Sequence, residues 1–343
     1  MPENPSPGES ASSTNFSTVS SGTEAGPRDP WAAFPPEYRI PATAPSLAEA
    51  QAYCRRLATT HYENFSVATW FLPERLRPHF YSVYAYCRIA DDLGDEAASR
   101  EDALQLLQEW EAELDACYTG NPRHPAMVAL RQTIIACDIP QDPLADLLRA
   151  FRQDQTVARY ANFDDLLQYC RYSANPVGRI VLYLCGYRDA ERQQLSDFTC
   201  TALQLANFWQ DVVPDFAKGR IYLPLESMQK FGVSEDDIAA RKFTPQFARL
   251  MSFEVEQARE WFARGWPLAK QVDKDLALDI ELFTRGGEEI LKAIERQGFD
   301  VLRRRPVISR PRKLWLVLGA LAGTAAARAS RPFLAGPAGK DGR

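Results

Sequence analysis

Apolar residues recur three and four positions apart along most of the chain, which is the spacing of a helix that buries one face. This periodicity predicts a helix that begins at Ser46, where Glu49 completes a capping box. A bend is expected where Gly286–Gly287 interrupt the last long pattern. Further amphipathic helices are predicted over 101–118, 123–137, 142–155 and 245–297. No stretch alternates apolar and polar positions for long enough to indicate a sheet, so we predict an all-α fold.

A first group of polar residues lies on an otherwise apolar helix, in the stretch FYSVYAYCRIADDLGDE at 80–96. Tyr84, Arg88, Asp91 and Asp95 follow one another at steps of four, three and four, so they share one face of that helix. Carboxylates crowded at its end repel one another, by up to ~4 kcal/mol for a pair at about 4 Å and an effective dielectric constant near 20. The cluster therefore indicates a bound cation; the alternative is a solvated acidic helix end.

A second polar face lies further along the chain. Gln204, Asn207, Asp211 and Asp215 are spaced by three, four and four, which places them on one face of one predicted helix, bent by Pro214. Both polar faces lie within apolar sequence, so the two helices are expected to face each other and form a cage of oxygen ligands. Mg²⁺ prefers such ligands and shares them with substrate phosphates. We therefore predict a magnesium site that binds a diphosphate, with the ligands Asp91, Asp95, Asn207, Asp211 and Asp215.

Two further stretches fit a site of that kind. Lys218, Arg220 and Tyr222 follow the second polar face and add hydrogen-bond donors for a diphosphate. In the helical pattern of 162–187, Pro176 removes a backbone hydrogen bond and predicts a kink. Small residues beside the kink leave room for an apolar chain. The alternative is a kinked core helix without a ligand.

Composition narrows the function further. The 343 residues carry a net charge of −5 and a pI near 5.5, which argues against a general nucleic-acid binder. No GxGxxG follows a predicted strand, so no nicotinamide-binding domain is expected. Seven cysteines without a CxxC pair are typical of reduced thiols in a cytoplasmic protein.

The N-terminal part, residues 1–45, is rich in Ser, Pro and Gly and lacks periodic apolar positions. It also lacks a basic segment followed by an apolar run, so it is not a signal peptide. We expect a disordered tail there. The alternative is that its aromatic residues, Trp31, Phe34 and Tyr38, dock on the body of the protein.

The C-terminal part, residues 301–343, combines basic and apolar residues. The basic residues are Arg303, Arg304, Arg305, Arg310, Arg312 and Lys313. They precede an apolar run of 14 residues, 314–327, which is shorter than the ~20 needed to span a bilayer. This pattern favours attachment to the anionic inner face of the cytoplasmic membrane. The alternative is a terminal helix packed on the folded domain, which is expected to span 46–300.

The paired motifs resemble those of the squalene/phytoene synthase family. The resemblance rests on YxxxRxxDDxxDE from Tyr84, QxxNxxxDxxxD from Gln204 and RIYLP at 220–224, and it extends from about residue 47 to 300. ENFSVATWFLP, YCRYSANPVGR and NFWQDV are similar to the hydroxysqualene synthase branch of bacterial hopanoid pathways. Two positions depart from the family pattern: Gln210 stands where most members have Arg, and Asn64 where Ser is frequent.

The resemblance implies a single-domain isoprenoid-synthase fold with a central cavity. It implies magnesium-dependent conversion of presqualene diphosphate to hydroxysqualene, with water and not NADPH ending the reaction. It also implies functional coupling to neighbouring enzymes of the squalene pathway. The implied substrate-binding residues are Asn64, Phe65, Arg88, Gln204, Lys218, Arg220 and Tyr222; the aromatic residues implied to stabilise the carbocation are Phe65, Tyr84 and Tyr169. The alternatives are a presqualene diphosphate, squalene or phytoene synthase, and a non-catalytic prenyl-binding membrane scaffold.

Overall fold

The computed structural model describes residues 29–60 and 73–308. These residues contain helices and no strand, so the all-α prediction is confirmed. The long helices are α1 (Leu47–Thr60), α3 (Arg77–Asp95), α4 (Arg100–Thr119), α5 (Pro125–Cys137), α6 (Asp142–Asp154), α7 (Phe163–Ser173), α8 (Asn175–Leu184), α9 (Ala190–Gln210), α13 (Pro245–Gly265) and α14 (Lys274–Arg296). Short helices connect them: η1 (Pro30–Ala33), η2 (Pro36–Tyr38), η3 (Glu74–Leu76), α10 (Val212–Ala217), α11 (Leu225–Phe231), α12 (Glu235–Ala239) and η4 (Trp266–Lys270).

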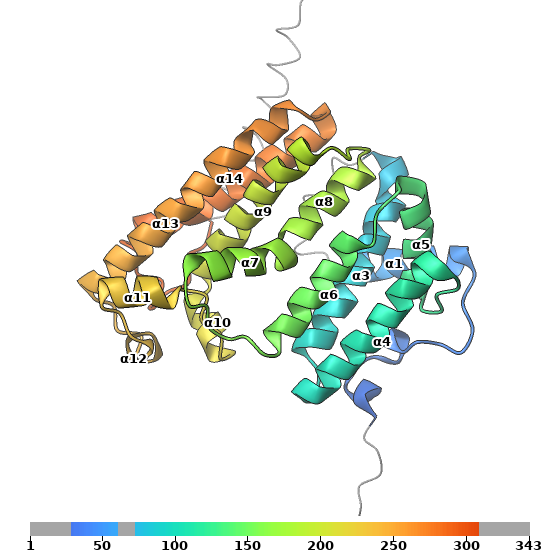
Figure 1. Cartoon of the computed structure of the whole chain (residues 1–343), viewed down its shortest axis with the longest axis horizontal. Helices are drawn as coiled ribbons and strands as arrows, with labels where there is room; N and C mark the ends of the chain where they lie inside the picture. The colour runs from blue at the N-terminus through green and yellow to red at the C-terminus, as the bar shows by residue number, and fades with distance from the viewer. Residues whose placement is uncertain (1–28, 61–72, 309–343) are drawn as a thin grey trace, which may run out of the picture.

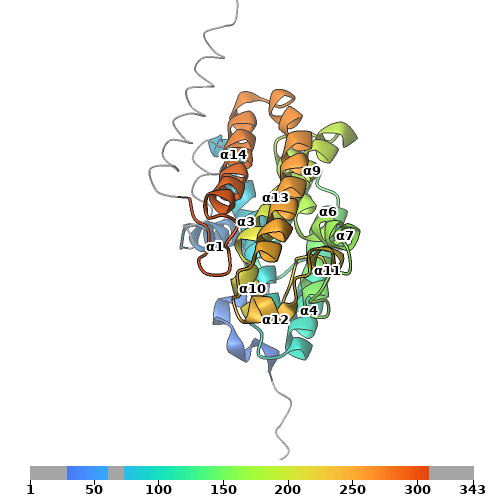
Figure 2. The same ribbon diagram turned by 90° about the vertical axis from the view of Figure 1, so that its left-hand side faces the viewer.

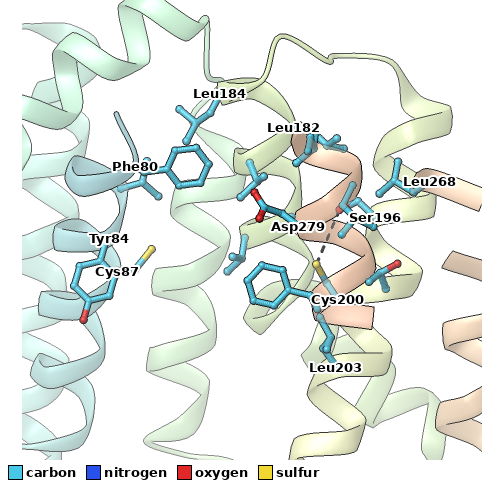
Figure 3. Close-up of a pocket in the computed structure, with 18 residues that line it drawn as sticks. Phe80, Tyr84, Cys87, Leu182, Leu184, Ser196, Cys200, Leu203, Leu268 and Asp279 are labelled. Carbon is cyan, nitrogen blue, oxygen red and sulfur yellow. Dashed lines mark hydrogen bonds between the residues drawn. The ribbon is translucent and has the colours of Figure 1, made fainter. Parts of the chain in front are cut away.

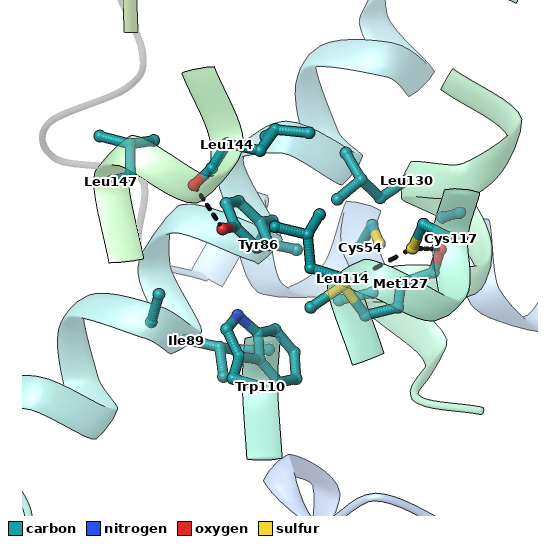
Figure 4. Packing of buried hydrophobic residues seen from close by; sticks show 14 of the residues in the cluster. Cys54, Tyr86, Ile89, Trp110, Leu114, Cys117, Met127, Leu130, Leu144 and Leu147 are labelled. Atoms are coloured by element: carbon teal, nitrogen blue, oxygen red, sulfur yellow. Dashed lines mark hydrogen bonds between the residues drawn. The ribbon is translucent and has the colours of Figure 1, made fainter. Parts of the chain in front are cut away.

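The helices form two packed groups that lie side by side (Figure 1). In the first, Tyr86 of α3 stacks on Trp110 with ring centroids 6.3 Å apart and donates its hydroxyl hydrogen to the Leu144 carbonyl at 2.8 Å (Figure 4). In the second, α9 lies against α13 and α14 and buries Trp209 and Phe262; Figure 2 shows α13 and α14 alongside each other. All seven cysteines are free thiols. Each group thus holds one of the two helices that carry the polar faces.

The helix predicted to start at Ser46 does so through its capping box. The Ser46 backbone N–H donates to Glu49 Oε2 at 2.9 Å, and the Glu49 N–H donates to Ser46 Oγ at 3.3 Å. The bend expected at Gly286–Gly287 is not found, because α14 continues through both residues. A Cβ at Gly287 would overlap Phe262 and Leu203, so this glycine permits close packing of α14 on α13 and α9.

The kink predicted from Pro176 is a complete break between two helices. The chain leaves α7 at Ala174, and Pro176 occupies the first turn of α8, where its missing N–H costs no hydrogen bond. A Cβ at Gly178 would overlap Ser196 and Cys200, so α8 lies very close to α9. The break therefore brings the start of α8 against the middle of α9.

The segment 29–45 differs from the expected disordered tail. Trp31 and Tyr38 are buried against the first helical group. Trp31 Nε1 donates to Glu109 Oε2 at 2.8 Å, and the Tyr38 hydroxyl donates to Asp92 Oδ2 at 2.7 Å. The alternative, in which these aromatic residues dock on the body of the protein, is the one found for this segment. The proline-rich sequence around them has no apolar periodicity that would reveal this burial. Residues 1–28 lie outside the described part.

The folded body also extends beyond residue 300. Val301 and Leu302 are 2% and 1% exposed and belong to the second core, so the domain continues to at least residue 308. Within the described ranges, no helix has both the length and the apolar character needed to cross a membrane. The proposed membrane segment from Arg310 onward lies outside the described residues.

Candidate functional site

The polar face of α3 ends in a network around Arg88. Arg88 Nε donates to Asp92 Oδ2 at 3.1 Å, and a terminal nitrogen pairs with Asp92 Oδ1. Tyr38 donates to the same carboxylate. Asp91 lies 3.7 Å from Arg88, and its side chain is half exposed. Arg88 is thus bound mainly to Asp92, while Asp91 and Asp95 lie next to it on the same helix end.

The second polar face is divided between two helices: the break predicted from Pro214 is found, but it lies at Asp211 and not just before Asp215. Helix α9 ends at Gln210, and Asp211 leaves the helical conformation with φ −109° and ψ 22° before α10 begins. Pro214 explains the break, because it has no N–H for the Gln210 carbonyl and its ring pushes that carbonyl aside. The Asp215 N–H still donates to the Asp211 carbonyl at 2.9 Å. Asn207 therefore lies exposed on α9, while Asp211 and Asp215 follow the break.

The two polar faces meet through basic residues that follow α10. Lys218 Nζ donates to Asp95 Oδ2 at 3.0 Å, and Arg220 donates to Asp95 Oδ1 at 3.1 Å. These bonds join the end of α3 to a segment more than 120 residues later in the chain, 123 and 125 positions away. The sequence-based expectation that basic residues lie at the acidic motifs is confirmed. Their contact with a diphosphate remains a prediction.

Arg305 is a residue of this site that the sequence analysis placed elsewhere. It was assigned to the membrane-binding cluster, but its guanidinium forms two hydrogen bonds to the Asp211 carboxylate, one of them 2.9 Å long. It also donates to Gln210 Oε1 at 3.2 Å, and Gln210 Nε2 donates to the Pro306 carbonyl at 2.6 Å. The segment after α14 thus supplies a cation at the position next to Gln210.

Asp154, at the end of α6, is a further carboxylate that the sequence analysis did not identify. The Tyr169 hydroxyl donates to Asp154 Oδ2 at 3.0 Å, and Asp154 Oδ1 is buried without a hydrogen-bond partner. The Tyr169 ring stacks on Tyr222, which in turn stacks on Phe208 at 3.8 Å between centroids. These buried rings hold Asp154 beside Arg220 and the carboxylates of α3.

The carboxyl groups of the site carry uncompensated charge. Burial, and next the charge of Asp95, raises the pKa of Asp91 to about 6. Burial, and next the charge of Asp211, raises the pKa of Asp215 to about 7. Burial raises the pKa of Asp154 to about 6, against the opposing charge of Arg220. Burial also acts on Asp95, but the hydrogen bond from Lys218 and the charge of Arg220 outweigh it and lower that pKa.

These residues fit a divalent cation in their chemistry. The site contains two pairs of carboxylates, each four residues apart, and the members of each pair raise the cost of ionising one another beyond the effect of burial. The unpartnered oxygen of Asp154 adds a hard oxygen donor nearby. Among the described residues, no three acidic, histidine or cysteine side chains already converge on one point, because Lys218, Arg220 and Arg305 occupy Asp95 and Asp211.

An apolar cavity of about 370 Å³ lies between the helices that precede the acidic motifs (Figure 3). Its walls come from α3, α8, α9, η4 and α14. Tyr84 and Cys87 of α3 line it one to two turns before Asp91, and Leu203 of α9 lines it one turn before Asn207. The cavity therefore leads away from the predicted diphosphate site, as a binding site for a prenyl chain requires.

The remaining predicted residues divide between the cavity and other surroundings. Tyr84 lies in the cavity wall, as expected of a residue that faces the carbocation. Tyr169 is not part of that wall and instead belongs to the aromatic cluster around Tyr222. Gln204 is partly buried on α9. Asn64 and Phe65 lie outside the described residues.

Comparison with known proteins identifies relatives over most of the chain. The family model of squalene/phytoene synthases matches residues 58–312. The chain is 34% identical over 270 residues to a hydroxysqualene synthase of Sinorhizobium fredii. This alignment covers 78% of this chain and 90% of that protein. It is 29% identical over 281 residues to a 15-cis-phytoene synthase of Synechococcus elongatus, covering 78% and 91%.

Solved structures agree with this fold. The crystal structure of squalene synthase HpnC from Alicyclobacillus acidocaldarius superposes with a TM-score of 0.71 and 48% identity, over 74% of this chain and 95% of that one. A dehydrosqualene synthase in complex with a ligand superposes with a TM-score of 0.74 and 26% identity, over 82% and 98%. The helical architecture described above is thus the one found in these synthases.

Proposed function

The chain belongs to the squalene/phytoene synthase family, and from that premise we propose that it converts presqualene diphosphate to hydroxysqualene with release of diphosphate. The family consists of isoprenoid synthases, so the alternative of a non-catalytic scaffold no longer applies. The observation that carries the proposal is a group of carboxylates and cations that follows, on α3 and α9, the residues lining an apolar cavity. This arrangement suits a substrate with one diphosphate and a long hydrocarbon part.

The cage residues bind the diphosphate through their charges. Magnesium held by Asp91, Asp95, Asp211 and Asp215 would neutralise the diphosphate and make it a better leaving group. Lys218, Arg220 and Arg305 already point at the carboxylates and can transfer their hydrogen bonds to diphosphate oxygens. Arg88 has an indirect role: it binds Asp92 and thereby fixes the end of α3.

The cavity then protects the carbocation. Its wall is made mostly of aliphatic and aromatic side chains, which do not react with a carbocation. The ring of Tyr84, at the end nearest the cage, can stabilise positive charge through its face. Tyr169 does not line the cavity; its hydroxyl donates a hydrogen bond to Asp154 and orients that carboxylate.

The choice within the family rests on two supports. The relatives named hydroxysqualene synthase and squalene synthase HpnC are 34% and 48% identical to this chain, against 29% for the phytoene synthase. Gln210 stands where arginine is usual, and its amide is occupied by the Pro306 carbonyl and by Arg305. The positive charge next to position 210 is therefore supplied by Arg305 of the C-terminal segment.

The test uses the purified full-length protein with magnesium and presqualene diphosphate, with and without NADPH, in water labelled with ¹⁸O. We expect hydroxysqualene that carries the label, at a rate that NADPH does not change. Squalene formed only with NADPH would contradict the proposal and identify a reducing squalene synthase. Efficient condensation of two farnesyl diphosphates would place the protein one step earlier, and phytoene from a longer substrate would assign it to the phytoene branch.

We also propose that the protein works at the inner face of the cytoplasmic membrane. Its substrate and product are almost insoluble in water, and the sequence from Arg310 onward combines positive charge with an apolar run. Attachment there would let the product enter the bilayer and reach the next enzyme of the squalene pathway.

A further inference from the structure

The cavity contains one acidic side chain among the described residues that line it, Asp279 of α14 (Figure 3). Asp279 is 6% exposed, and its Oδ1 is buried without a hydrogen-bond partner. Among the described lining residues there is no Lys, Arg or His. A buried polar group left unpaired costs about 1–3 kcal/mol, so a carboxyl in this wall requires an explanation.

Two hydroxyl-bearing residues of the neighbouring helix line the same cavity as Asp279, and we call this part of the wall the corner. Ser196 and Thr199 of α9 line the cavity and are buried, and α9 packs against α14. Thr199 Oγ1 donates to the Leu195 carbonyl at 3.4 Å and lies against Gly265 of α13. A buried water needs two to four polar partners. In this mostly apolar wall Asp279 Oδ1 is an unpartnered acceptor, and Ser196 and Thr199 are further polar side chains.

The corner lies at a suitable distance from the predicted diphosphate site. Ser196 and Asn207 are 11 residues apart on α9, which corresponds to about 16 Å along the helix. That length accommodates the cage side chains, metal–oxygen bonds of about 2.1 Å, the diphosphate and the reacting carbons. A water at the corner would then meet the hydrocarbon on the side opposite to the departing diphosphate.

We propose that Asp279 positions the water that captures the carbocation and accepts its proton, an inference that rests on the proposed function. The diphosphate leaves with the electron pair of its carbon–oxygen bond. The cyclopropylcarbinyl cation left behind rearranges, and a carbon–carbon bond of its three-membered ring breaks. The water oxygen donates an electron pair to the cationic carbon and forms the new carbon–oxygen bond. One water proton passes to the Asp279 carboxylate and leaves for the diphosphate or solvent when the product is released. No oxidant or reductant takes part.

The ionisation of Asp279 is compatible with this role. Burial, and next the charges of Asp275 and Asp273 on the same helix, raise its pKa to about 7. A substantial fraction is therefore ionised at neutral pH, and a nearby carbocation favours the ionised form. The titratable groups that face the cavity from α3 and α9 are neutral there, because burial raises their pKa values: Tyr84, Cys87 and Cys200.

The test measures diphosphate release and the ratio of alcohol to hydrocarbon products for the full-length protein with magnesium and presqualene diphosphate. Asp279→Asn keeps the size of the side chain but cannot accept the proton, and Asp279→Leu also removes the water. We expect the alcohol fraction to fall at least about tenfold in both, with hydrocarbons formed by proton loss instead. Diphosphate release should fall less than the alcohol fraction does. Asp279→Glu should restore part of the alcohol.

Glu254→Gln is the matched control, because Glu254 is a fully buried carboxyl of α13 that does not line the cavity. It should keep the wild-type product ratio. An unchanged ratio in Asp279→Leu, with alcohol formed by the wild type, would overturn this inference alone. Unfolding of both neutral variants, or equal loss of diphosphate release and alcohol, would assign Asp279 a structural role instead. A wild type that forms no alcohol would overturn both proposals.

Discussion

At the scale of single residues, the site differs from an ordinary acidic surface in the protonation of its carboxyl groups. Asp91 and Asp215 have raised pKa values because they are partly buried and lie beside a second carboxylate. Asp95 has a lowered one because two cations contact it. Ligands of a divalent cation must be ionised, so metal binding and protonation compete at the same atoms.

We predict that Asp91→Asn and Asp215→Asn each lower turnover by at least about 100-fold, because each removes one charged metal ligand. Both proteins should remain folded, since the change relieves repulsion in the metal-free site. Activity assays combined with magnesium titration by calorimetry measure the effect.

Asp92→Asn, one position from Asp91, is the control for that comparison. Its carboxylate is held by Arg88 and Tyr38, so we expect reduced thermal stability with magnesium affinity largely retained. Full activity of Asp91→Asn would contradict the assignment of these carboxylates as ligands.

The second prediction concerns pH. The folded-state pKa values of Asp91 and Asp215, about 6 and about 7, exceed the value of about 3.9 in an unfolded chain. The folded protein therefore holds more protons between about pH 4 and pH 7, and without metal its stability falls as the pH rises through that window. Magnesium binds the deprotonated form, so its stabilising effect should grow with pH.

Thermal unfolding at about pH 5.5 and pH 7.5, with and without magnesium, measures this dependence. At a metal concentration about a hundredfold above its dissociation constant, we expect Tm to rise by about 5 °C at the higher pH and by clearly less at the lower one. An increase of the same size at both pH values would argue against these carboxylates as the ligands.

The same scale shows which site residues a sequence can reveal. The aspartates of both motifs and Tyr84 were predicted because their spacing within one helix is a local property. Asp154, Arg305 and Asp279 were missed because each gains its role from residues far along the chain, such as Asp211 for Arg305. A lone Asp in an amphipathic helix carries no local signal that it faces a cavity.

At the scale of elements, the sequence predicted helices well and their ends less well. Most helices started within a few residues of the expected positions, because caps and apolar periodicity are local. The break at Asp211 arises one turn before the proline that causes it, so Pro214 indicated a bend but not its position. The segments 29–45 and 300–308 were misjudged, because composition does not reveal a few buried apolar side chains.

The third prediction separates two roles of the C-terminal part. Deletion of 309–343 should release the protein from vesicles that contain anionic lipid and keep activity on detergent-dispersed substrate. Deletion of 300–343 should also lower thermal stability, because burial of the Val301 and Leu302 side chains stabilises the fold by about 1.5–3 kcal/mol each. This deletion also removes Arg305 from the site. Vesicle sedimentation, thermal unfolding and activity distinguish the two. Vesicle binding unchanged by the shorter deletion would contradict membrane attachment.

At the scale of the whole molecule, the cavity is lined by helices of both large cores and by the small cluster of Leu182, Leu268 and Leu276. The sequence predicted the all-α class, because that class follows from the periodicity of the apolar residues. It could not predict how the cations pair with the carboxylates, since those contacts join α3, the segment after α10 and the segment after α14. That pairing determines how the site behaves before any ligand arrives.

The ion pairs of Asp95 and Asp211 imply that metal and diphosphate bind with a favourable coupling free energy. Either ligand alone must break contacts of Lys218, Arg220 or Arg305 without replacing them all. When both bind, the metal takes the carboxylates and the diphosphate takes the cations. Each ligand should therefore raise the affinity for the other by the same factor, on the order of 5–150-fold. Calorimetric titration of magnesium with and without inorganic diphosphate measures this factor, and Arg305→Gln should reduce it; equal magnesium affinities in the two titrations would show that the ion pairs do not link the ligands.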